Sequence, residues 1–172
     1  MKRTEQREHI FKLIFGADFN EESEQGTQTE LYLEQIEGAT EKDMQYISQK
    51  AQKIIEKIDE IDTLINEHTT GWKTGRMNKV DLTILRLAVY EMKWDEDVPT
   101  GVAINEAVNL AKKYSSEDGA SFVNGVLAKL ADYSEVENGS KCIYSKTGEF
   151  LYKEYVHPGL YAEPYLCKRR SL

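Results

Sequence analysis

The amino-acid sequence predicts an all-α fold, with roughly six or seven helices packed as a bundle. Apolar residues recur at helical spacing through most of the chain, and no good strand pattern occurs before residue 140. The clearest stripe recurs at three- and four-residue spacing, at Ala51, Ile54, Ile55, Ile58, Ile61 and Ile65. The 172 residues are 40% hydrophobic and 30% charged, which is typical of a globular protein with one domain or two small subdomains.

The first half of the chain is expected to contain three helices and one loop. Gly26 interrupts a polar, acidic stretch, which favours a loop there. Thr40 is a suitable N-cap, because Glu41 and Asp43 place negative charge at the positive end of the next helix. The expected elements are a helix over 4–17, a loop over 20–28, a short helix over 31–36 and a long helix from 41 to about 67.

The second half is expected to contain three helices joined by short polar segments. Asn78 can cap the first of them, and Asp81 adds charge to its first turn. Apolar residues on several sides of that helix indicate a central position, and Pro99 suits the start of the next one. The expected elements are a joint over 69–76, helices over 78–92 and 98–114, a turn over 115–120 and a last helix beginning near 122.

The composition changes after residue 138, so we divide the chain into residues 1–138, a helical domain, and residues 139–172, a C-terminal extension. The extension has no helical periodicity and contains both cysteines, Cys142 and Cys167. It is either a short hairpin around Thr147 and Gly148 or a flexible tail, and we favour the tail. Two cysteines this close to one end do not make a disulfide framework for the body.

Several functional classes are disfavoured by the sequence. No run of about 18 apolar residues is present, and the N-terminus lacks the pattern of a secretory signal, so we expect a cytoplasmic protein with no membrane span. The three histidines are far apart and the cysteines lack CxxC spacing, which disfavours a metal site. No phosphate-binding glycine loop or nucleophile elbow occurs. We therefore expect no enzyme activity, no metal and no cofactor.

The net charge of −8 opposes nucleic-acid binding over the whole surface but not at a restricted patch. Residues 21–68 hold 13 acids and 4 bases, whereas residues 1–20 hold 4 bases and 3 acids. Arg3 and Arg7 are four residues apart on one helix face, near Lys2 and Lys12. With the aromatic residues Phe11, Phe15 and Phe19, this face suits single-stranded RNA, unless it is only the charged outer side of a core helix.

Polar residues inside the apolar helices are interpreted as structural. Asn105, Glu106 and Asn124 would find partners on neighbouring helices, and Gly125 would permit a close backbone approach. Arg86 would be a side chain at the edge of the core, paired with a carboxylate.

An ordered set of motifs over about residues 1–133 resembles the NusB family of bacterial transcription antitermination factors. The set comprises a basic first helix ending in an aromatic residue, a Trp followed by an Arg, an ILR helix, a proline turn, AINEA and FVNGVL. These are Arg3 to Phe15, Trp72 with Arg76, Ile84 to Glu91, Pro99, Ala103 to Ala107, and Phe122 to Leu127. The resemblance implies two packed helical subdomains and a non-catalytic adaptor that binds boxA-type RNA of ribosomal RNA operons. The implied partners are NusE, a small-subunit ribosomal protein, and an RNA polymerase complex with NusA and NusG.

The resemblance also implies the binding residues. Those expected to contact RNA are Lys2, Arg3, Arg7, Phe15, Asp118, Ser121 and Phe122, and Asp81 is expected to face NusE. The sequence departs from the family pattern at Thr4, Glu5 and Gln6, where more basic residues often occur, and at Ser121. These departures predict weak RNA binding without NusE.

Two other functions are compatible with the resemblance. The first is the NusB-like domain of ribosomal RNA cytosine methyltransferases, but these 172 residues contain no α/β domain for the cofactor. The second is a structural or self-associating module, such as a homodimer that covers Arg3 and Arg7. We favour antitermination over both.

Overall fold

The computed structural model describes the backbone of residues 1–20, 22–69, 71, 73–138, 141–144 and 150–154, and the side chains of residues 1–20, 25–69, 71 and 73–131. The described residues form seven α-helices, one short 3₁₀ helix and two strands. The helices are α1 (Arg3–Ala17), α2 (Glu22–Glu34), α3 (Glu41–Ile55), α4 (Ile58–His68), α5 (Lys79–Trp94), α6 (Thr100–Tyr114) and α7 (Gly119–Asn138). The 3₁₀ helix η1 is Thr74–Arg76, and the strands are β1 (Lys141–Tyr144) and β2 (Phe150–Glu154). The all-α body and its number of helices are confirmed.

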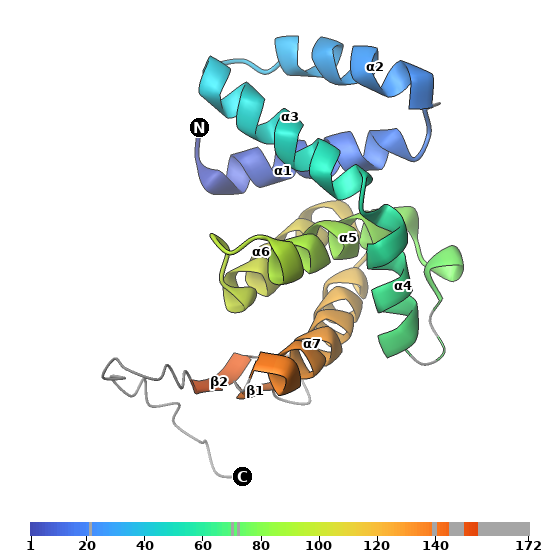
Figure 1. The fold of residues 1–172 in the computed structure, drawn as a ribbon, viewed down its shortest axis with the longest axis vertical. Helices are drawn as coiled ribbons and strands as arrows, with labels where there is room; N and C mark the ends of the chain where they lie inside the picture. The colour runs from blue at the N-terminus through green and yellow to red at the C-terminus, as the bar shows by residue number, and fades with distance from the viewer. Residues whose placement is uncertain (21, 70, 72, 139–140, 145–149, 155–172) are drawn as a thin grey trace.

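The helices form two packed groups (Figure 1). Helices α1, α2 and α3 pack on one another, and α4, α5, α6 and α7 form the second group. Helix α5 joins the two, because it contacts α1 and α3 as well as α4, α6 and α7. Every residue of α5 from Asp81 to Glu91 is buried. A single hydrophobic core therefore runs through both groups, with α5 at its centre.

Two predicted helix starts are confirmed in atomic detail. The Thr40 side chain accepts a hydrogen bond from the Asp43 backbone N–H at 3.2 Å, and the Asp43 carboxylate accepts one from the Thr40 N–H at 3.0 Å. The Asn78 side chain accepts from the Val80 N–H at 2.8 Å. Pro99 immediately precedes α6, as expected.

The predicted loop over 20–28 is wrong, because helix α2 begins at Glu22 and passes through Gly26. A Cβ at Gly26 would meet nothing within 4 Å, so this glycine serves no close contact. The helix is held by tertiary contacts, since Tyr32 and Leu33 pack against the core and the Tyr32 hydroxyl lies 2.7 Å from His9 Nδ1. Packing of a few apolar residues thus outweighs the weak helical preference of the polar stretch.

The long helix predicted from 41 to about 67 is also wrong in one respect, because it breaks at Glu56 and Lys57. Ile54 before the break and Ile61 after it are both fully buried. Helix α3 packs mainly on α1, whereas α4 packs on α5 and α7. The apolar stripe is real, but its two halves are buried in different groups of helices, which requires the change of direction.

Arg86 and Asn124 agree with the structural interpretation of residues inside the helices, whereas Asn105 and Gly125 differ from it. Arg86 is 5% exposed and binds Asp62 through two hydrogen bonds of 2.7 and 2.8 Å, as the sequence predicted. Asn124 is buried. Asn105 is exposed, however, and a Cβ at Gly125 would meet nothing within 4 Å. The expected close approach at Gly125 is therefore wrong.

After α7, strands β1 and β2 pair antiparallel, with Lys141 opposite Glu154 and Ile143 opposite Tyr152. This pairing corresponds to the hairpin alternative for this part of the extension. Trp72, Thr147, Gly148 and residues 155–172, Cys167 among them, lie outside the described residues. The division into residues 1–138 and 139–172 stays a prediction.

Candidate nucleic-acid interface

The first basic residues of the chain are open to solvent. Lys2 precedes α1, Arg3 begins it, and both side chains are exposed. The Arg3 guanidinium lies 4.7 Å from the centre of the Tyr46 ring and donates a long hydrogen bond, 3.5 Å, to the Gln6 side chain. A guanidinium that rests on a ring keeps its hydrogen-bond donors directed outward. Lys2 and Arg3 are therefore accessible, which is compatible with the predicted phosphate contact.

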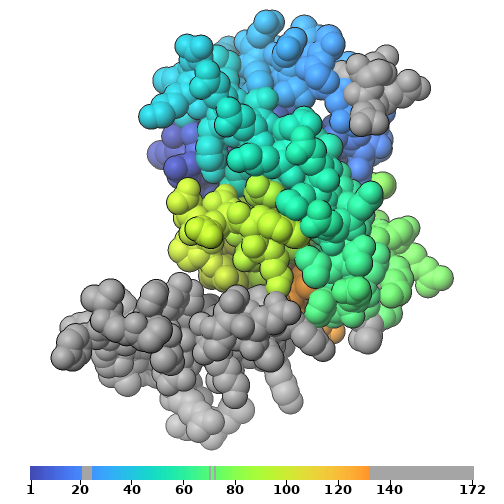
Figure 2. Space-filling view, viewed as in Figure 1, coloured from blue at the N-terminus to red at the C-terminus, as the bar shows by residue number. Residues whose placement is uncertain are grey.

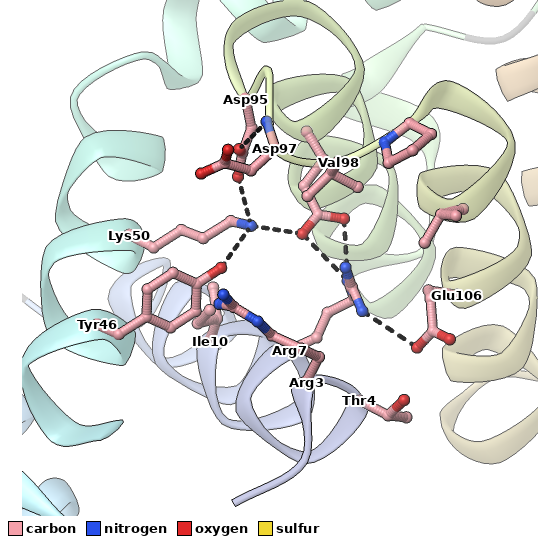
Figure 3. A pocket seen from close by; sticks show the side chains of 13 residues that line it. Arg3, Thr4, Arg7, Ile10, Tyr46, Lys50, Asp95, Asp97, Val98 and Glu106 are labelled. Carbon is pink, nitrogen blue, oxygen red and sulfur yellow. Dashed lines mark hydrogen bonds and ion pairs between the residues drawn. The ribbon is translucent and has the colours of Figure 1, made fainter. Parts of the chain in front are cut away.

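Arg7 differs from these two residues, because it is only 8% exposed. Its Nε donates to both oxygens of Glu91, at 3.1 and 2.9 Å, and a terminal nitrogen donates to Glu106 at 3.2 Å (Figure 3). The two ion pairs and the burial argue against the phosphate contact predicted for Arg7. A four-residue spacing from Arg3 did not reveal that this side chain turns toward α5 and α6.

Arg7 and Lys50, both labelled in Figure 3, pair with Glu91, and all three residues line a pocket of about 220 Å³. Lys50 Nζ lies 2.6 Å from Glu91 and 2.8 Å from Asp95. Burial lowers the pKa of Lys50, but the charge of Glu91 and the hydrogen bonds to Asp95 and Glu91 outweigh it, so the pKa is raised. Lys50 therefore stays charged. We call Arg7, Lys50, Glu91, Asp95 and Glu106 the buried ion network.

This network connects the two groups of helices. It takes side chains from α1 and α3 on one side, and from α5, α6 and the turn between them on the other. The space-filling view shows the same junction from outside, with α3 above the start of α6 (Figure 2). Within the network two cations are paired with three carboxylates, so both cations already have partners and its chemistry is that of a structural connection.

An aromatic ladder follows one side of α1. The ring centres of Phe11 and Phe15 are 6.1 Å apart, those of Phe15 and Phe19 are 5.1 Å apart, and Phe11 lies 5.1 Å from Tyr114 of α6. Phe11 is 4% exposed, Phe15 is half-buried and Phe19 is 64% exposed. Phe11 is thus a core residue rather than the exposed aromatic expected from sequence, whereas Phe15 and Phe19 present ring surface on which a base can stack.

The remaining predicted RNA contacts lie at the start of α7. Asp118 and Ser121 are exposed, and Phe122 is half-buried against the core. The contact between Phe11 and Tyr114 brings the middle of α1 to the end of α6, four residues before Asp118. Arg3 and Phe15 are twelve positions apart on one helix, or about 18 Å along its axis. The predicted residues therefore form two groups, one near each end of α1, and do not form one compact cluster.

Asp81 was expected to face a protein partner, but it is only 6% exposed. Its carboxylate accepts a hydrogen bond from the Ser115 hydroxyl at 2.5 Å. A Cβ added to Gly119 would lie 2.0 Å from the same hydroxyl oxygen and 3.0 Å from the carboxylate. Asp81 thus anchors the turn between α6 and α7, and this burial argues against a direct role in partner binding.

A cluster between the two groups of predicted residues was not foreseen from sequence. The Glu8 carboxylate accepts hydrogen bonds from Lys113 Nζ, at 2.7 Å, and from the Tyr114 hydroxyl, and Lys12 Nζ lies 3.3 Å away. Burial raises the pKa of Glu8, but the hydrogen bonds from Lys113, Tyr114 and Lys12 outweigh this and lower it to about 2. We call these four residues the Glu8 cluster. The Glu8–Lys12 spacing was visible in the sequence, but its link to α6 was not.

The described part of the chain lacks two further features. There, no three His, Cys, Asp or Glu side chains gather closely enough to bind a metal ion. No described helix has the length and apolar character needed to cross a membrane.

Comparisons with known proteins agree with this fold. A family model described as the NusB family matches residues 4–132. A transcription antitermination protein NusB from Agathobacter rectalis is 52% identical over 131 residues, which are 76% of this chain and 100% of that protein. A structure of T. maritima NusB is similar with a TM-score of 0.67 and 29% identity, and the match covers 80% of this chain and 98% of that one.

A second solved structure contains a nucleic acid. A crystal structure of antitermination factors NusB and NusE in complex with dsRNA is similar with a TM-score of 0.67 and 26% identity. The match covers 77% of this chain and 99% of that chain.

Proposed function

The chain belongs to the NusB family, and on that premise we propose that it is a transcription antitermination factor that binds RNA without catalysing a reaction. The proposed RNA is a boxA-type, single-stranded segment of ribosomal RNA operons, and the proposed partner is NusE. The pair would then join RNA polymerase, NusA and NusG in the cytoplasm. The observation that carries the proposal is the likeness to a NusB solved together with NusE and RNA, which extends over nearly all of that chain.

The surface of the molecule supports a division of tasks along α1. Lys2 and Arg3 supply exposed positive charge for phosphates at one end, where contacts set the register of the RNA. Phe15 supplies a ring for stacking at the other end. Phe122 is a second aromatic residue, and it is close in sequence to the exposed polar residues Asp118 and Ser121. Arg7 acts indirectly, since its ion pairs hold α1 against α5 and α6.

The charge distribution restricts binding to this region. Residues 21–68 hold 13 acids and 4 bases, so phosphate is repelled from the surface that these residues form. With few exposed bases on α1, affinity for RNA should be low for the isolated chain. A second protein that adds contacts to the same RNA would raise it, which is the role we propose for NusE.

Fluorescence anisotropy of a labelled boxA-type RNA tests the proposal. The protein is titrated with and without purified NusE, and an unrelated RNA of equal length serves as the control. We expect selective binding that strengthens when NusE is present. Arg3→Ala should weaken it, whereas Lys53→Ala, which removes an exposed charge from α3, should not.

Equal binding of both RNAs, or no binding with NusE present, would contradict the proposal. In that event the alternative of a self-associating module would be examined by measuring the mass of the protein in solution. A homodimer that covers Arg3 would predict a mass twice that of the 19.8 kDa chain.

A further inference from the structure

The Glu8 cluster occupies the space between the two groups of residues expected to contact RNA. Glu8 follows Arg7 on α1, and Lys12 is one turn further along the same helix. Lys113 and Tyr114 come from the last turn of α6, shortly before Asp118. Because the Tyr114 ring also contacts Phe11, the cluster continues directly into the aromatic ladder. Along the axis of α1, Glu8 and Lys12 lie between Arg3 and Phe15.

The cations of this cluster are accessible, unlike Arg7. The side chain of Lys113 is 58% exposed and that of Lys12 is 38% exposed, whereas Glu8 is 21% exposed. Both ammonium groups and the Tyr114 hydroxyl point at one carboxylate. Two positive charges share one negative charge, so the cluster has a local charge of +1. It therefore retains an attraction for a further anion.

We propose that Lys113 and Lys12 bind a backbone phosphate of the RNA, and that Glu8 competes with this phosphate for their ammonium groups. The proposal rests on the RNA-binding function proposed above. A carboxylate and a phosphate oxygen accept the same charge-assisted hydrogen bonds from an ammonium group. Lys113 must therefore give up, or share, its 2.7 Å contact with Glu8 when a phosphate arrives. In the free protein, Glu8 holds both lysines in position and at the same time lowers their affinity for RNA.

This arrangement predicts that Lys113→Ala weakens RNA binding and that Glu8→Gln tightens it. Lys113→Ala removes a phosphate contact, so RNA binding with NusE present should weaken about three- to tenfold, and the salt dependence should flatten by about one unit of slope. Lys112→Ala is the matched control, because Lys112 is the adjacent exposed lysine on the same helix and makes no contact with Glu8. It should change affinity less than twofold.

Glu8→Gln removes the competing charge and keeps the shape of the side chain. RNA binding should tighten about three- to tenfold and its salt dependence should steepen. In the double variant Glu8→Gln with Lys113→Ala, most of that gain should be lost, because the lysine released by the first change is absent. Circular dichroism verifies that each variant is folded. If Glu8→Gln does not fold, Lys113→Ala still tests the phosphate contact, because this substitution is at an exposed position.

The outcomes separate this inference from the proposed function. If the wild-type protein binds selectively but Lys113→Ala behaves as Lys112→Ala, the phosphate contact is refuted and the function stands. If Glu8→Gln is folded and weakens binding, Glu8 positions the lysines without competing, and the inference is overturned. If the wild-type protein with NusE binds no RNA, both proposals fail.

Discussion

Replacement of Glu91 by glutamine tests whether the buried ion network holds the two groups of helices together. Glu91 is 1% exposed and receives hydrogen bonds from Arg7 and from Lys50. Glutamine keeps the size of the side chain but removes the charge. The glutamine side chain also directs its N–H₂ group toward Arg7 or Lys50. Both cations are hydrogen-bond donors, so neither can accept a bond from that group.

The loss in the free energy of unfolding depends on which ion pairs Arg7 and Lys50 keep in the Glu91→Gln variant. Removal of one partner from a buried ion pair costs about 3–5 kcal/mol, because the other charge is left buried and unpaired. Here Arg7 keeps Glu106, at 3.2 Å, and Lys50 keeps Asp95, at 2.8 Å. We therefore expect the lower value, a loss of about 3 kcal/mol in the free energy of unfolding. For a chain of this size, that corresponds to a fall in Tm of about 6–12 °C.

Urea unfolding followed by circular dichroism measures this loss, with Glu106→Gln as the matched control. Glu106 makes one ion pair with Arg7 and its side chain is 17% exposed, so the control should lose about 1 kcal/mol or less. The reasoning is refuted if the Glu91 variant loses no more stability than the Glu106 variant. Such a result would mean that burial of the network costs as much free energy as its contacts return.

Three further predictions concern the helix ends and the Glu8 cluster. Gly119→Ala should lower the free energy of unfolding by about 1–3 kcal/mol, because the new Cβ would lie 2.0 Å from the Ser115 hydroxyl oxygen. Thermal melts measure this loss, and Gly125→Ala is the control because a Cβ there would meet nothing within 4 Å. Asn78→Ala should cost about 1 kcal/mol by removing the cap of α5, a loss that Asn78→Asp should largely avoid in the same assay. The pKa of Glu8 falls from 4.5 to about 2 on folding, so the unfolded chain takes up this proton first and stability declines as pH falls from 4.5 toward 2. The stability difference between wild type and Glu8→Gln should therefore shrink over that interval in urea melts, and a difference independent of pH would contradict the assignment.

Much of the helical framework could be predicted from local features of the sequence. The caps at Thr40 and Asn78 are made by side chains within three residues of the helix start, so spacing alone identifies them. The central position of α5 followed from its apolar residues on several sides. The region from Glu22 to Glu34 could not be predicted, because its helix depends on contacts of Tyr32 and Leu33 with the core.

The candidate interface was predicted less completely than the fold. Lys2, Arg3, Phe15, Asp118 and Ser121 are all at least partly exposed in the structure, which is compatible with contact to RNA. Arg7 and Asp81 were chosen by the same reasoning and are buried. The residues next to a charged side chain in the sequence do not show whether it is buried or exposed. Its direction depends on whether another helix supplies a carboxylate or hydroxyl partner.

The sequence by itself determined the helical class, the position of most helices, the family and the basic character of the first turn of α1. These properties depend on periodicity and on residues close together in the chain. Only the tertiary structure decided which charges reach solvent. Glu8 meets Lys113 across 105 positions and Arg7 meets Glu91 across 84, and both pairings arise from the packing of α1 against α5 and α6. Burial of a charge requires a partner of opposite sign at hydrogen-bond distance, and that distance is set by how helices pack rather than by their order in the chain.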